Sequence, residues 1–205
     1  MGSFFPDEPK KLKDRISRYR RALRTDLSDG AGKRFLVGPM YLLLGDIDGA
    51  IGYYDWYSEA FPDDGPEPFN HLSWALSLYK VGRMVDAATK IRQTMFSNLY
   101  LVPHLLGVKP QSLKIWHGSN WAELDYAIDL PEELLGLWDP DARAWAKSVY
   151  NDPATSTERA RFIEIEAQLL DAAPGPSRSA LVREAFKMRE GKAALVLVPA
   201  SEEWS

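Results

Sequence analysis

Histidine is the first residue type to examine for metal binding or acid–base chemistry, and the chain has three. His71, His104 and His117 are never spaced at i and i+4. None lies in the His-Glu-x-x-His arrangement, in which one helix face presents two imidazoles to zinc. The chain has no cysteine, which excludes disulfides, thiolate metal sites and a cysteine nucleophile. We therefore expect no metal site.

The acidic residues also have simple explanations. The tetrapeptide Asp-Ile-Asp-Gly at 46–49 resembles the start of a calcium loop, but the later oxygen ligands are missing. Aspartates where a helix begins are explained by capping and the helix dipole. Glu158, Glu164 and Glu166 fit a solvated helix face better than an acid/base pair. The chain has neither a Gly-x-Ser-x-Gly nucleophile turn nor a Gly-rich phosphate loop. We therefore expect no catalytic residue and no cofactor.

The charge distribution argues against nucleic acid as the partner. The 205 residues have a net charge of −4, yet residues 1–27 contain eight basic and four acidic side chains. The basic segment 10–27 could contact nucleic acid or anionic lipid, but an amphipathic cap with a solvated basic face is the favoured interpretation. The longest apolar run, 35–44, is about half of the ~20 residues that a membrane span needs. The start of the chain has no apolar stretch typical of a signal peptide, so a cytoplasmic protein without a membrane segment is expected.

Apolar residues at helical spacing, separated by Gly and Pro, predict an all-α fold. In the first helix the apolar residues recur at steps of three and four. Pro39 should kink the second helix or delay its start. An irregular connection is expected at 107–118 and a packed tail at 193–198. The expected helices span 10–27, 33–44, 48–61, 67–81, 84–97, 120–130, 132–138, 140–150, 155–172 and 177–190.

Two segments share one pattern, which predicts a repeat. Residues 41–54 and 78–91 both read large apolar, three residues, Gly, four residues, Ala, three residues, large apolar. Gly45 and Gly82 are 37 residues apart, which is a 34-residue period with an insertion in the Pro-rich loop at 62–66. Small side chains would let the helices of each pair approach closely. The repeat positions are Gly38, Tyr41, Gly45, Ala50, Tyr54, Pro62, Ala75, Leu78, Gly82, Ala87 and Ile91.

This pattern resembles the tetratricopeptide repeat (TPR) family, with a first repeat at 31–64 and a second starting at Pro68. In the second repeat Leu99 replaces the closing proline. Residues 98–145 are similar to an extension of some bacterial TPR proteins. The resemblance implies a short helical-repeat array of antiparallel helix pairs with capping helices at both ends. The expected segments are 1–30 (basic cap), 31–107 (two repeats), 108–151 (extension) and 152–205 (hairpin and tail).

In the TPR family the first helix of each pair lines a concave groove, and here those positions are unusually apolar. A contiguous apolar surface usually marks an interaction site, so the expected function is a non-enzymatic protein-binding or scaffolding module. Three occupants remain open: a partner peptide, a second copy in a homo-oligomer, or the chain's own helix 10–27 or the segment after 163, with self-filling favoured. The groove residues are Phe35, Pro39, Leu42, Leu43, Phe69, Leu72, Leu76 and Tyr79.

One known TPR role is excluded by the same positions. The family's chaperone-binding domains hold a carboxylate tail with a Lys and Asn clamp, but here those places are Phe35, Pro39 and Ser73. Aromatic residues often anchor partners at contact points. The expected anchors are Trp56, Tyr57 and Trp116.

Overall fold

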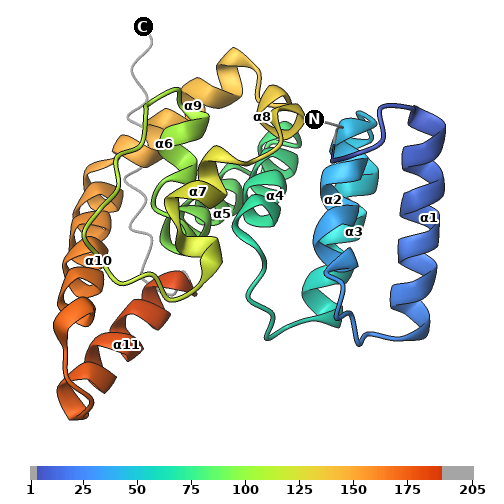
Figure 1. The fold of residues 1–205 in the computed structure, drawn as a ribbon. Coiled ribbons are helices and arrows are strands. Elements are labelled where there is room, and N and C mark those ends of the chain that lie inside the picture. Colours follow the sequence, from blue (N-terminus) through green and yellow to red (C-terminus); the bar gives the residue numbers. More distant parts are fainter. Residues whose placement is uncertain (1–3, 191–205) are drawn as a thin grey trace, which may run out of the picture.

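The computed structural model describes residues 4–190, and this part of the chain contains helices but no strand. The helices run from one end of the molecule to the other in nearly sequential order (Figure 1). The elements are α1 (Pro9–Thr25), α2 (Lys33–Leu43), α3 (Ile47–Ala60), α4 (Pro68–Lys80), α5 (Met84–Ser97), α6 (Leu101–Leu105), the 3-10 turn η1 (Asn120–Ala122), α7 (Leu124–Ile128), α8 (Glu132–Gly136), α9 (Pro140–Asn151), α10 (Pro153–Asp171) and α11 (Pro176–Arg189).

Two antiparallel pairs form the centre of the fold, α2 with α3 and α4 with α5, and the pairs stack through α2 and α4. Helix α1 packs on α2 at one end, while α9, α10 and α11 pack near α5 at the other (Figure 1). The chain is therefore a short helical-repeat array with capping helices at both ends, as the sequence pattern predicts.

The turn inside each pair is the same structure, which explains the two glycines of the repeat. Gly45 and Gly82 have φ of 71° and 77°, a region in which a side chain is strained. Each N–H donates to the carbonyl three residues back, and the next N–H donates to the carbonyl five back, closing the Schellman motif. Both turns thus pair the last carbonyls of the helix with the same hydrogen bonds, and both reverse the direction of the chain.

Close helix approach explains the small residues. Gly38 lies against the ring of Tyr54, which a Cβ at position 38 would overlap. Ala50, Ala75 and Ala87 are fully buried. Small side chains at these places bring the axes of each pair together, and the tyrosine fills the space beside them.

Helix α1 begins with Pro9, whose missing N–H costs nothing in a first helical turn. Its buried face consists of Leu12, Ile16 and Leu23, and Tyr19 packs beside them. Leu27 was expected to extend this stripe, but the helix ends at Thr25 and Leu27 is exposed. The basic residues cover the outward faces, as in an amphipathic cap.

One core joins all parts of the described chain, from Phe5 to Ala185. Buried polar contacts tie the C-terminal helices to it. Arg92 of α5 pairs with Glu158 of α10. Arg143 of α9 donates to backbone carbonyls of Leu105, Leu135 and Trp138, which lie in or beside α6 and α8. None of the helices within 4–190 is both long and apolar enough to cross a membrane.

Besides the earlier end of α1, the structure differs from the predicted elements in three places. The short helix α6 was not predicted. The expected helix 120–130 is split into η1 and α7, with Glu123 extended between them. The expected helix 155–172 begins earlier, at Pro153, because Asp152 caps α10 by accepting from the Thr155 N–H. Pro39 lies inside α2, which begins at Lys33, so it does not delay the start of the helix. The expected tail at 193–198 lies outside the described residues.

Candidate functional site

The predicted groove residues are not an open surface, which corrects the expected concave binding face. Phe35, Pro39, Leu42, Phe69, Leu72 and Leu76 are buried, while Leu43 and Tyr79 are half-buried and pack against the core.

The extension contacts three of these residues. The ring of Trp121 meets Phe35 edge-on at 6.0 Å, and Trp145 lies 4.8 Å from Tyr79. The Phe69 N–H donates to the Tyr126 hydroxyl at 3.2 Å. At these three residues the groove is therefore filled from within the chain, by η1, α7 and α9, while α1 packs on α2.

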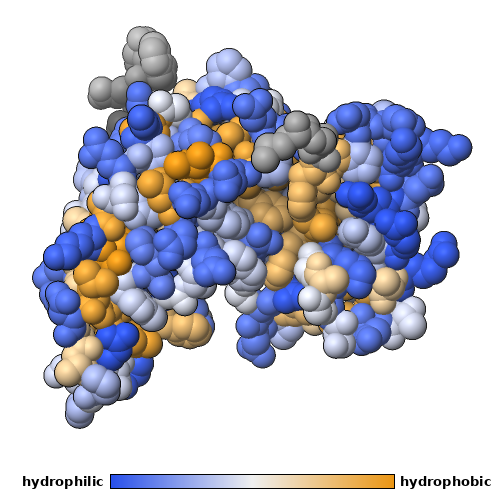
Figure 2. Space-filling model, in the orientation of Figure 1, coloured by the Kyte–Doolittle hydropathy of each residue, from blue (hydrophilic) through white to orange (hydrophobic). Residues whose placement is uncertain are grey.

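An open cleft of about 670 Å³ lies elsewhere, between the α3–α4 loop and the end of α11. Figure 2 shows it as a notch in the lower middle of the molecule, between the part that contains α11 and the part that contains α2 and α3. Its lining comes from the end of α3 and the following loop, from α4 and α5, from residues 116–122 and from α11. The cleft therefore lies on a side of the repeats that includes the second helix of each pair, α3 and α5.

Aromatic rings form most of the apolar lining of this cleft. Trp74 of α4 stacks on the buried Tyr54 at 4.8 Å with an interplanar angle of 5°, and Tyr57 meets it edge-on at 6.0 Å. Phe186 of α11 is 58% exposed and Trp121 is 38% exposed, so both offer apolar surface to a ligand. The aromatic residues that line the cleft are Tyr57, Phe61, Trp74, Trp116, Trp121 and Phe186.

Ion pairs fix the loop that forms one wall of the cleft. Asp64 accepts from the Tyr57 hydroxyl and from Arg34 Nε, both at 2.6 Å. Arg34 also donates to the carbonyl of Asp29 at 2.9 Å, and its guanidinium lies 5.4 Å from the centre of the Phe61 ring. The wall is therefore preformed rather than dependent on a ligand.

Helix α11 is fixed in the same manner on the other side. Arg189 donates to Glu166 Oε1 at 2.7 Å and to the Phe96 carbonyl at 3.4 Å. Burial raises the pKa of Glu166 above its usual value, and the neighbouring Arg189 opposes this. The cation of Arg189 therefore already has a partner within the protein.

Lys90 is the exception among the cations that line the cleft. Its Nζ lies 3.6 Å from the centre of the Trp74 ring, a cation–π distance. Within residues 4–190 no carboxylate lies within 4.0 Å of this amine. Burial lowers the pKa of Lys90 from 10.5 to about 8, and only the charge of Asp86 opposes this. The amine is thus mostly protonated at pH 7 but has no counter-ion in the described part of the chain.

Among the described residues, two more polar groups of the cleft lack hydrogen-bond partners. His71 is only 6% exposed, and its Nδ1 accepts or donates no hydrogen bond in the described structure. Burial lowers the pKa of His71 well below 6.5, so the ring is neutral at pH 7. The Gln93 amide N–H donates to the carbonyl of Glu190 at 3.2 Å, but its Oε1 is buried without a partner. Most buried polar groups in proteins have a hydrogen-bond partner, so the inner end of the cleft is less well satisfied than its walls.

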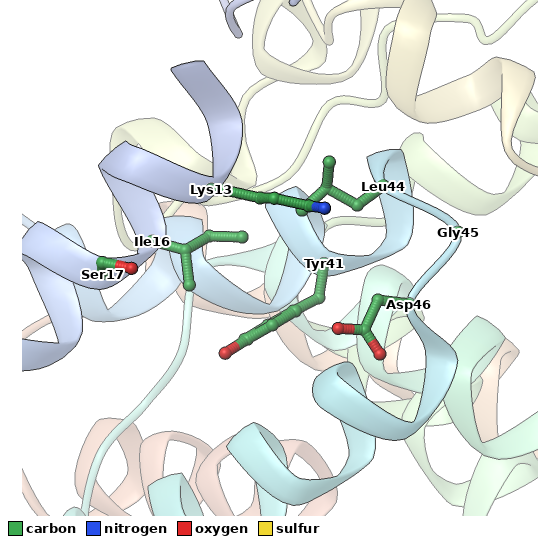
Figure 3. Close-up of a pocket in the computed structure, with 7 residues that line it drawn as sticks. All are labelled: Lys13, Ile16, Ser17, Tyr41, Leu44, Gly45 and Asp46. Carbon is green, nitrogen blue, oxygen red and sulfur yellow. The ribbon is translucent and has the colours of Figure 1, made fainter. Parts of the chain in front are cut away.

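A second hollow, of about 530 Å³, lies between α1 and the turn from α2 to α3 (Figure 3). Two of its polar groups already have structural roles. Asp46 caps α3 by accepting from the Gly49 N–H at 2.8 Å, and the Tyr41 hydroxyl accepts from Arg20 at 2.6 Å. Neither of these two groups therefore needs a ligand.

The other expected chemistry can now be placed. No group of three or more potential metal ligands occurs in the described part of the chain. His117 lies 3.1 Å from the Tyr100 hydroxyl, away from His71. Of the expected anchors, Tyr57 and Trp116 line the cleft, whereas Trp56 packs against Tyr53 and Phe61.

Sequence reasoning missed Lys90, Trp74 and Phe186 as site residues. In the sequence, Lys90 is an ordinary helix lysine. The only available signal for it as a site residue was the acidic Asp86, one helical turn before it. Comparisons with protein-family models, curated proteins and solved structures gave no match to this chain, so the functional assignment rests on the geometry of the cleft.

Proposed function

We propose that the chain is a non-enzymatic, TPR-type interaction module that binds an extended segment of a partner protein in the aromatic cleft. The observation that supports this most is the preformed cleft of about 670 Å³ with Trp121 and Phe186 partly exposed in it. Aromatic side chains in a concave site are the commonest anchors of protein interfaces. The shared glycine turns and buried small residues of the two pairs support the TPR-type assignment. A cytoplasmic location, suggested by the absence of cysteine, is part of the proposal.

The test compares two side chains of equal exposure. Phe186 in the cleft and Val108 outside its lining are each 58% exposed. Twelve-residue peptides selected by display on the full chain would be labelled with fluorescein, and their affinities measured by fluorescence anisotropy. We expect Phe186→Ala to weaken binding about tenfold, because a buried aromatic anchor is worth at least 1 kcal/mol. Val108→Ala should leave the affinity unchanged.

Equal affinities for both variants and the wild type would overturn the proposal. A dimer in sedimentation velocity that Phe186→Ala dissociates would instead assign the cleft to a second copy of the chain.

A further inference from the structure

The inner part of the cleft contains a positive charge that no described carboxylate neutralises. The amine of Lys90 is half-buried over Trp74 and lacks a carboxylate partner within residues 4–190, while Arg189 and Arg34 are each paired with one. A half-buried cation without a counter-ion is unfavourable, because the ring faces it on one side only and water reaches it incompletely. An anion placed beside it would remove this penalty.

His71 does not neutralise this amine. Its side chain is more than nine-tenths buried, and burial keeps the ring neutral at pH 7. His71 Nδ1 and Gln93 Oε1 have no hydrogen-bond partner within residues 4–190, but both atoms are buried in the protein rather than open to the cleft. The feature that a ligand in the cleft can satisfy is therefore the charge of Lys90.

We infer that the cleft selects a segment of a partner protein that contains an acidic residue, whose carboxylate lies against Lys90. This inference rests on the proposed function and specifies its ligand. Apolar residues on either side of the acid contact Trp116, Trp121 and Phe186. A free carboxylate would satisfy Lys90 but would leave the aromatic walls without partners.

The acidic groups of the cleft are compatible with such a ligand. Asp64 is paired with Arg34, while Asp63 is exposed on the loop at the rim and Glu190 is exposed after α11. Within residues 4–190 none of the three forms an ion pair with Lys90. The residues involved also differ from Phe35, Pro39 and Ser73, the clamp positions of chaperone-binding TPR domains, so the site is distinct from that clamp.

The test uses pools of fluorescein-labelled nonapeptides. Each pool has Glu, Gln, Asp or Asn at the central position and an equimolar mixture of Leu, Val, Phe, Tyr, Ser and Gly at the others. Anisotropy titrations of the full chain should give about tenfold tighter binding for the acidic pools than for the amide pools, as charge-assisted hydrogen bonds contribute more than neutral ones. Lys90→Met should abolish this preference and Lys90→Arg should retain it.

Lys187→Met is the matched control, because Lys187 is an exposed lysine of α11 outside the cleft lining. It should leave the preference unchanged. A second readout is the ¹³C NMR titration of Lys90, whose pKa should rise when the glutamate pool is added and not when the glutamine pool is added.

Equal binding of the glutamate and glutamine pools overturns the inference. Where that equal binding is lost in Phe186→Ala, the protein-binding proposal still holds. Where no pool binds the wild type more tightly than it binds Phe186→Ala, both proposals fail. A loss of preference in Lys187→Met as large as in Lys90→Met would also overturn the inference, because it would show a response to overall charge.

Discussion

Lys90 has an electrostatic cost in the unliganded protein that can be measured. Its amine is held over Trp74, with neutral His71 on α4 and Asp86 on α5 as the titratable groups that influence it. Because its folded pKa is about 8, below the usual 10.5, the unfolded chain binds more protons between these two values. The free energy of unfolding therefore rises with pH across this window, and the penalty is fully present below pH 8. It amounts to about 3 kcal/mol before the attraction of the ring is subtracted.

Replacing Lys90 with methionine should remove this penalty. We expect Lys90→Met to increase the free energy of unfolding by about 1–2 kcal/mol at pH 7, and the gain to disappear above pH 10.5, where the lysine is neutral in both states. Urea unfolding at the two pH values measures the difference. Lys187→Met, which removes a solvated lysine, should show no such pH dependence. A gain from Lys90→Met that is the same at both values would contradict the expectation.

At the scale of the helix, close packing within a pair depends on residue 38. A Cβ at Gly38 would overlap the ring of Tyr54, which is fully buried and also reaches Asn70 Oδ1 at 3.3 Å. The ring cannot move without disturbing its stacking on Trp74, which lines the cleft. Packing of the first pair is therefore linked to the shape of the site.

Two Gly→Ala substitutions test this link. Gly38→Ala should lower the free energy of unfolding by about 1–3 kcal/mol, the usual cost of overpacking a core. Gly52→Ala in α3, where a Cβ would meet nothing within 4 Å, should instead raise it by about 0.5–1 kcal/mol. Chemical denaturation of both variants measures this contrast. Equal and small effects would mean that the helices of the pair do not approach as closely as described.

The elements differ in how far the sequence determines them. The two turns were predictable because their positive φ favours glycine. The small residues were predictable because closely approaching helices leave no room for larger side chains. Helix α6 was not, because five residues that include Pro103 give too little periodicity to recognise. The apolar groove positions were correctly identified as one face, but what covers them depends on contacts with residues 121–145. Such long-range contacts have no local signal.

The cleft was unpredictable for the same reason. Lys90 and Phe186 line the same cleft only because α11, which follows far along the chain, packs near α5. Local sequence patterns predict each helix but not the packing of α11 near α5.

At the scale of the whole molecule, one core extends through every capping helix and both pairs. The chain should therefore unfold in a single cooperative transition, as single cores usually do. Far-ultraviolet circular dichroism reports all helices, whereas tryptophan fluorescence reports the surroundings of seven side chains, from Trp56 to Trp204. We expect the two urea curves to coincide. Separate midpoints would show that the repeat pairs and the C-terminal helices are independent units.

The lining of the cleft extends from Tyr57 in α3 to Glu190 after α11. A nascent chain on the ribosome can thus fold both helix pairs before the last wall of its binding site has been synthesised. A protease that cuts the exposed turn at 173–175 would likewise separate α11 from the preceding helices. In both situations the molecule would have much of its helical content but an incomplete binding site.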